Sequence, residues 1–157
     1  MRRSVAALLV VAALAACGGG GGPSGPALSR SQLVSRVNGE CGKLLQAGNS
    51  LLAAQDPNAH GSRVAQFMKK AASQLRDRVR AIGALHPPSS IAGDVSRFVS
   101  LLGRYADGLD ALAGRIKSTE TYSELLDRST AQVDALNQLS GQANAIAAKL
   151  GFTACAT

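Results

Sequence analysis

The sequence predicts an all-α protein folded as an antiparallel up-down-up-down four-helix bundle with short loops. Apolar residues recur at three- and four-residue steps through long segments after residue 29. Cap patterns, prolines or glycines bound these segments, and the connections between them are short. We expect a signal peptide at residues 1–16, a lipidated cysteine with a Gly/Pro-rich flexible tether at residues 17–28, and one helical domain at residues 29–157.

The N-terminal segment has the three parts of a secretory signal. Arg2 and Arg3 precede an apolar run over residues 5–16, which ends in small residues directly before Cys17. This run is shorter than the roughly 17 to 25 apolar residues that a membrane span needs. Its Leu-Ala-Ala-Cys ending looks like the lipobox of bacterial lipoproteins, in which the cysteine sulfur receives a diacylglycerol. The pattern predicts export and anchoring by Cys17 to the outer face of the cell membrane; the alternative is cleavage beside residues 15–16, which releases a soluble protein.

The first predicted helix begins after Ser29, since Ser29 and Gln32 fit a capping box and Leu28 and Leu33 fit a hydrophobic staple. It ends at the Asp-Pro-Asn sequence of residues 56–58. Its apolar stripe comprises Leu33, Val37, Cys41, Leu44, Gly48, Leu51 and Leu52.

The second predicted helix runs from about Ser62 to the Pro87-Pro88 pair, because proline excludes helical geometry from the residue before it. Its apolar stripe comprises Val64, Phe67, Met68, Ala71, Leu75, Val79, Ile82 and Leu85.

The third predicted helix starts at about Ser90 and has a regular bundle seam. The seam comprises Ile91, Val95, Phe98, Leu102, Tyr105, Leu109, Leu112 and Ile116. A fourth helix starts at the capping box of Thr121 and Glu124 and continues without a break to Leu150. Gly151 suits a left-handed C-terminal turn, after which Phe152 folds back on the last turn.

The chain has three cysteines, an odd number that would leave one thiol unpaired in an exported protein. In an oxidising compartment, free thiols tend to form disulfides. Lipid on Cys17 would leave Cys41 and Cys155, which the bundle topology brings together at one end. A disulfide between them would close a long loop and stabilise the folded state by about 4 to 5 kcal/mol in the chain-entropy model. The alternative is a small buried Cys41 on the apolar stripe and a free Cys155 thiol near a frayed terminus.

Three features of the chain are the basis of a family resemblance. They are an early helix bearing Cys41, the Pro87-Pro88 break, and the closing Leu-Gly-Phe-x-x-Cys155. They look like a group of small exported helical proteins from high-GC actinobacteria, many of which have lipoboxes and whose activity is uncharacterised. The resemblance covers most of the chain after the signal peptide. It implies export, a helical bundle and a terminal disulfide, and it says nothing about an activity or about site residues.

Few residues point to catalysis, metal binding or a cofactor. His60 and His86 stand at opposite ends of the second predicted helix, about 35 to 40 Å apart at 1.5 Å per residue. They cannot share a metal, and we interpret both as loop or helix-end residues. Met68 lies on an apolar stripe, so we expect it in the core rather than on a haem. Short catalytic and phosphate-binding motifs are missing from the sequence, and we expect no catalytic residue, no metal and no cofactor.

Acidic residues are interpreted as surface. Asp107 and Asp110 lie three residues apart on the third helix, where we expect them to be solvated. An acidic stripe starts the fourth helix, and the positive end of the helix dipole accounts for most of it. The stripe comprises Glu120, Glu124, Asp127 and Asp134.

The distribution of positive charge is the remaining feature that could indicate a contact surface. The chain carries a formal charge of +7, and the second helix is rich in Lys and Arg. Lys69, Arg76 and Arg80 fall close together opposite the apolar stripe, so they predict an outward basic ridge. Such a ridge could contact anionic lipid or a wall polymer, or it could be an ordinary solvated helix face. Nucleic acid is a poor candidate partner, because export separates the chain from it and aromatic residues are only 3%.

These observations favour a non-enzymatic, membrane-anchored lipoprotein that is an interaction or structural module of the cell envelope. Its expected partners are the membrane, through the lipid anchor, and anionic lipid, a wall polymer or another envelope protein. The alternative is an exported bundle that binds a small apolar molecule or haem between its helices. A cavity of several hundred Å³ would favour that alternative. The sequence leaves the oligomeric state open.

Overall fold

The computed structural model describes residues 26–54, 56 and 59–156, and these residues are predominantly helical. The predicted signal peptide and Cys17 lie outside the described residues. The all-α fold class is confirmed for the described part of the chain. The elements are α1 (Arg30–Ala53), α2 (Ser62–Gly83), the 3₁₀ turn η1 (Ser89–Ile91), α3 (Ala92–Ala113), α4 (Tyr122–Arg128) and α5 (Thr130–Leu150).

Local sequence signals set several helix ends. The Ser29 hydroxyl accepts the N–H of Gln32 at 3.2 Å, and the Gln32 side chain accepts the N–H of Ser29 at 2.9 Å. Thr121 and Glu124 form the same reciprocal pair at the start of α4. At the end of α5, Gly151 has a φ of +83°, and the N–H of Phe152 donates to the carbonyl of Ala147 at 2.8 Å. These three cap predictions are confirmed.

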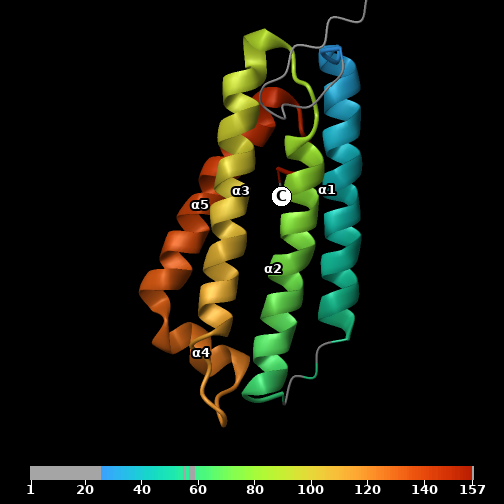
Figure 1. Ribbon diagram of the computed structural model, residues 1–157. Helices are drawn as coiled ribbons and strands as arrows, with labels where there is room; N and C mark the ends of the chain where they lie inside the picture. Colours follow the sequence, from blue (N-terminus) through green and yellow to red (C-terminus); the bar gives the residue numbers. More distant parts are fainter. Residues whose placement is uncertain (1–25, 55, 57–58, 157) are drawn as a thin grey trace, which may run out of the picture.

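The long helices lie beside one another along most of their length (Figure 1). α2 packs against both α1 and α3, and α3 also packs against α5. After α5 the chain crosses to α1, where the Cα atoms of Cys41 and Cys155 are 5.2 Å apart and their sulfurs form a disulfide. The side chain of Asn38 accepts the N–H of Ala154 at 3.0 Å, so a hydrogen bond also holds this crossing segment to α1.

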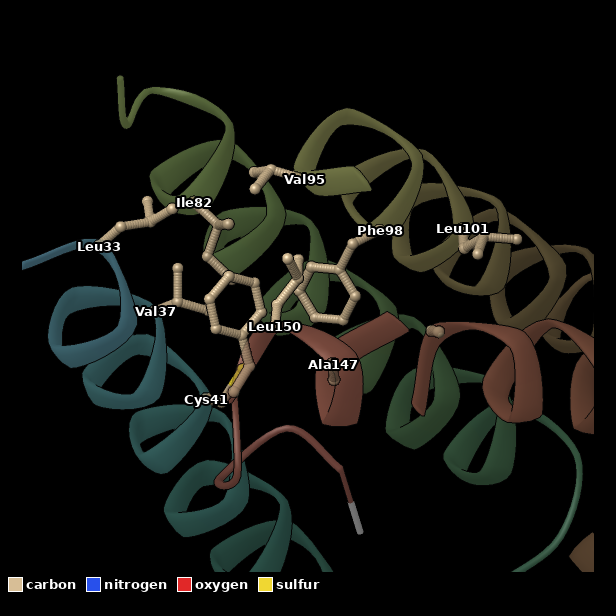
Figure 2. Packing of buried hydrophobic residues seen from close by; sticks show 11 residues of the cluster. Leu33, Val37, Cys41, Ile82, Val95, Phe98, Leu101, Ala147 and Leu150 are labelled. Atoms are coloured by element: carbon tan, nitrogen blue, oxygen red, sulfur yellow. The ribbon is translucent and has the colours of Figure 1, made fainter. Parts of the chain in front are cut away.

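One apolar cluster occupies the end of the molecule near the disulfide. Figure 2 shows Leu33 and Val37 of α1 facing the same interior as Ile82 of α2 and Phe98 of α3. Phe152 is fully buried there, with its ring centroid 5.6 Å from that of Phe98. Residues from α1, α2, α3, α5 and the C-terminal segment therefore share one core, as most of the apolar stripes predict. The stripe prediction is wrong at Leu52, which is 61% exposed at the end of α1.

A second apolar cluster fills the opposite end of the molecule. It comprises Val64, Met68, Leu112, Ala113, Leu125 and Leu136. Met68 is only 2% exposed, so it is a core residue, as the sequence predicts. Leu125 places the short helix α4 in this cluster.

Leu28, two residues before α1, contacts the helical domain. Leu28, the last residue of the predicted tether, packs against the first cluster. Its N–H donates at 2.8 Å to the backbone carbonyl of His86, a residue just after α2. Leu28 therefore belongs structurally with the helices that follow it.

The prediction of one continuous fourth helix is wrong. The helix is broken at Ser129, where φ is −110° and ψ is 26°, and α4 and α5 lie on either side. At the end of α4, the N–H of Ser129 donates to the carbonyl oxygens of Leu125 and Leu126. At the start of α5, the carbonyl of Ser129 accepts the N–H groups of Gln132 and Val133. The Ser129 side chain makes no capping hydrogen bond to α5, so the break is held by these backbone contacts.

The third helix is shorter than predicted. α3 ends at Ala113, with its C-terminal cap at Gly114, whereas the predicted stripe continues to Ile116. Ile116 lies beyond the helix and packs against the second cluster from the connecting segment. An apolar residue at helical spacing can therefore reach the core from a turn, which is why the periodicity overran the end of α3.

Gly61 supports a close backbone contact before α2, and this gives a testable prediction. Its φ is +53°, and a Cβ atom there would collide with the carbonyl oxygen of Ser118. Replacing Gly61 by Ala is expected to lower the free energy of unfolding by more than about 1 kcal/mol, measured by urea denaturation. Gly39→Ala is the control, because no atom lies within 4 Å of a Cβ there; it should raise stability by up to about 1 kcal/mol. Equal effects of the two substitutions would contradict this account of Gly61.

Candidate functional site

The predicted basic ridge is changed by contacts from a neighbouring helix. Lys69 is exposed, with no carboxylate partner in the part of the chain that the structure describes. Arg80 is exposed and pairs with Asp77 on the same helix. Arg76, in contrast, reaches across to α3, where its Nη2 lies 3.0 Å from Asp107 and 3.1 Å from Asp110. Of the three predicted ridge residues, Arg76 therefore also joins two helices.

The same contact adds a partner to Asp107 and Asp110. Their side chains are 72% and 41% exposed, as the surface prediction expects, and both carboxylates accept hydrogen bonds from Arg76. The hydrogen bond to Asp107 is the largest cause that raises the pKa of the Arg76 guanidinium, and the hydrogen bond to Asp110 is the second. The sequence did not reveal this pairing, because 31 residues separate Arg76 from Asp107. The cluster is a bridge between α2 and α3.

A second bridge joins α2 to α1. Arg78 Nη1 donates to Glu40 Oε2 at 2.8 Å, and Lys43 Nζ contacts the other oxygen of Glu40 at 2.6 Å. The hydrogen bond from Lys43 is the main cause of the lowered pKa of Glu40, and Arg78 adds to it. Arg76 and Arg78 thus connect α2 to its neighbours on both sides, so these charges serve the packing of helices.

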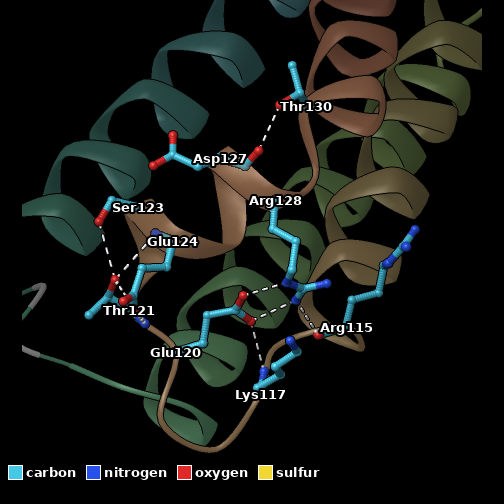
Figure 3. Close-up of polar contacts among 9 residues, drawn as sticks. All are labelled: Arg115, Lys117, Glu120, Thr121, Ser123, Glu124, Asp127, Arg128 and Thr130. Atoms are coloured by element: carbon cyan, nitrogen blue, oxygen red, sulfur yellow. Dashed lines mark hydrogen bonds and ion pairs between the residues drawn. The ribbon is translucent and has the colours of Figure 1, made fainter.

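The most connected polar cluster lies between α3 and α4 (Figure 3). Arg128 Nε and Nη2 donate to the two oxygens of Glu120 at 2.6 and 2.7 Å, and Nη2 also donates to the carbonyl of Arg115 at 2.9 Å. The N–H of Lys117 donates to Glu120 Oε2 at 2.9 Å. Glu120 is 7% exposed, so the bidentate pair is largely withdrawn from solvent on the carboxylate side.

These contacts refine the predicted acidic stripe. The pKa of Glu120 is lowered to about 2, mainly by the hydrogen bonds from Arg128 and next by the hydrogen bond from the N–H of Lys117. Glu124 accepts the N–H of Thr121 at 2.7 Å, and this bond lowers the pKa of Glu124. Glu120 is thus held by an arginine eight residues away, and not only by the positive end of a helix.

The Glu120–Arg128 pair predicts a specific dependence of stability on acid. The pKa of Glu120 is about 2 in the folded protein against 4.5 ordinarily, so its stabilisation is complete above about pH 5 and is lost as pH falls from 4.5 towards 2. Glu120→Gln should therefore lower the urea midpoint most at pH 6 to 7 and least near pH 2. Asp134→Asn is the control, since Asp134 is exposed, and its difference from wild type should not follow this course. A constant difference for Glu120→Gln across this pH range would contradict the role assigned to Glu120.

Both histidines lie at helix ends, as the sequence predicts. His60 precedes α2, and its Nδ1 lies 3.0 Å from the carbonyl of Thr119. The backbone of His60 also pairs with Thr121 in an isolated bridge. His86 follows α2 and accepts the N–H of Leu28. Within the described ranges, no three His, Cys, Asp or Glu residues gather in a way that could hold a metal ion.

Two hollows on the described surface bear on the small-ligand alternative. A hollow of about 60 Å³ lies beside the disulfide, among Leu44, Leu45, Phe98 and Leu102. Pockets for drug-sized ligands usually hold about 300 to 1,000 Å³. A wider hollow of about 320 Å³ is lined by the charged residues around Glu120 and Arg128, which are already bonded to each other. Neither of these hollows favours the small-ligand alternative.

Among the described residues, no helix combines the length and the apolar character that crossing a bilayer requires.

No family model, no curated protein and no solved structure matches this chain.

Proposed function

We propose that the protein is a non-enzymatic lipoprotein, anchored by Cys17 to the outer face of the cell membrane, which acts as an interaction or structural module of the envelope. The disulfide is the observation that carries this proposal. Disulfides persist mainly in oxidising compartments outside the cytoplasm. The bond between Cys41 and Cys155 uses two of the three cysteines and leaves Cys17, which follows the signal-like segment.

The proposal includes an antiparallel up-down-up-down bundle of α1, α2, α3 and α5. Contacts between element ends support it. Leu28, before α1, bonds to His86, after α2, and Gly61, before α2, bonds to Glu120, which follows α3. Lys149 near the end of α5 pairs with Asp94 near the start of α3 at 2.7 Å. Each contact joins the beginning of one helix to the end of its neighbour, which is typical of antiparallel packing.

The uses of the charged side chains support a structural role. Arg76 and Arg78 each bond to a carboxylate on a neighbouring helix, and Arg128 bonds to Glu120 in the segment before α4. These bonds hold the helices and that segment in place. The resemblance to small exported lipoproteins of high-GC actinobacteria belongs to the same proposal and points the same way. It implies an exported, disulfide-bonded helical domain.

Mass spectrometry of the full precursor expressed in a lipoprotein-processing bacterium tests the proposal. Wild type should float with the membrane fraction, begin at Cys17, carry a diacylglycerol and lack about two hydrogens because of the disulfide. Cys17→Ala should abolish the lipid mass and the membrane association. Ser24→Ala is the matched control and should behave as wild type. A wild-type protein that stays in the soluble fraction, without an acyl mass, would overturn the proposal.

A further inference from the structure

Internal ion pairs leave a particular set of cations on α2 and α3. Lys69 and Lys70 on α2, and Arg97 and Arg104 on α3, are exposed and have no carboxylate partner among the described residues. The nearby carboxylates are engaged, because Asp107 and Asp110 bond to Arg76 and Asp77 bonds to Arg80. The charge that remains available on these two helices is therefore positive.

These cations lie on the outward side of two adjacent helices. On α2, Val64, Met68 and Leu75 form the buried side, and Lys69 and Lys70 project away from it. On α3, Arg97 and Arg104 are seven residues apart, about two turns, so they share one side. At 100° per residue that side is turned away from the buried Phe98 and Val95.

The two helices hold this arrangement firmly. α2 and α3 lie side by side (Figure 1), and Arg76 fixes their relative position through Asp107 and Asp110. We name the outward surface of these two helices the α2–α3 basic face. It is defined by Lys69, Lys70, Arg80, Arg97 and Arg104.

We propose that the α2–α3 basic face docks on anionic phospholipid headgroups of the membrane that carries the protein. This inference rests on the proposed function, since the anchor keeps the domain beside the bilayer and makes docking an intramolecular step. Each Lys or Arg near an anionic leaflet favours the docked state about fivefold. Four unpaired cations together favour it by a factor on the order of hundreds, so the domain rests with α2 and α3 against the lipid.

Lysine acetylation provides the test in the full lipidated protein. The protein is reconstituted in vesicles of phosphatidylcholine alone or of phosphatidylcholine mixed with phosphatidylglycerol, and flotation confirms the anchoring. Acetylation rates are then read by mass spectrometry, with Lys149 as the internal reference because it lies on α5 and pairs with Asp94. In the mixed vesicles Lys69 and Lys70 should react at least about fivefold more slowly, and salt near 1 M should restore their rates, because the Debye length falls to about 3 Å.

Two variants of equal charge loss sharpen the result. Arg97→Gln with Arg104→Gln removes the part of the face on α3 and should abolish most of the slowing at Lys69 and Lys70. Arg115→Gln with Lys117→Gln removes the same charge from the segment after α3, off the face, and should preserve the slowing. Equal slowing in both double variants would overturn the assignment of Arg97 and Arg104 to the docking surface.

The vesicle experiment also separates the two proposals. Flotation with equal acetylation rates in both kinds of vesicle would overturn docking and leave the lipid anchor intact. Failure to float would overturn the anchor and, with it, the docking that depends on it. Protection by added poly(glycerol phosphate) on phosphatidylcholine vesicles, without protection by phosphatidylglycerol, would assign the face to a wall polymer and overturn the lipid proposal.

Discussion

Replacing Cys41 and Cys155 together by alanine is expected to lower the free energy of unfolding by about 4 to 5 kcal/mol. The two residues are 114 positions apart, so the bond closes most of the helical domain into one loop. In the chain-entropy model, the cross-link removes much of the conformational freedom of the unfolded chain. An effect this large is comparable with the whole stability of many domains.

Urea unfolding with and without reductant measures the effect of the disulfide. The oxidised wild type should have the highest midpoint, whereas the reduced wild type and the double variant should lie close together. The double variant should also be insensitive to reductant, which serves as the internal control. A midpoint of the oxidised wild type equal to that of the double variant would show that the cross-link does not stabilise the fold.

Truncation of Phe152 to alanine is expected to cost about 3 to 5 kcal/mol of stability. Phe152 is fully buried although it lies beyond the end of α5, and its ring packs on Phe98 in the first cluster. Removing the ring would leave a cavity where α1, α3 and the C-terminal segment meet. The loss should also loosen the segment that carries Cys155.

Phe67→Ala is the matched control for this prediction. Phe67 is only partly buried, and its edge-to-face contact with Tyr122 has a centroid distance of 6.2 Å. The same chemical truncation should therefore cost clearly less than at Phe152, because less apolar surface is withdrawn from water. Both losses are measured by urea denaturation of the oxidised proteins. A loss at Phe67 that matched or exceeded the loss at Phe152 would contradict the importance assigned to the C-terminal segment.

Helix starts and ends were predictable where their signals are short. Ser29 bonds to Gln32, and Thr121 bonds to Glu124, within one helical turn. Gly151 and Phe152 act on the last turn of the helix before them. Such contacts span only a few residues, so local preferences are enough to form them.

Polar partners across the fold were not predictable in the same way. The pairing of Arg76 with Asp107 depends on how α2 packs beside α3, and no short pattern relates the two residues. The break at Ser129 was missed because apolar residues continue at helical spacing on both sides of it. Burial of Leu125 in the second cluster and the bond from Arg128 to Glu120 hold α4 in its own position.

The helical class of this protein, the caps of three helix ends and most of each apolar helix side are predictable from the amino-acid sequence, because these features depend on contacts within a few residues. The packing of the helices against one another determines which charged side chains pair between helices and which remain exposed on α2 and α3. Ion pairs such as Arg78 with Glu40 form only when packing brings distant turns within about 3 to 4 Å, and sequence spacing carries no record of that distance.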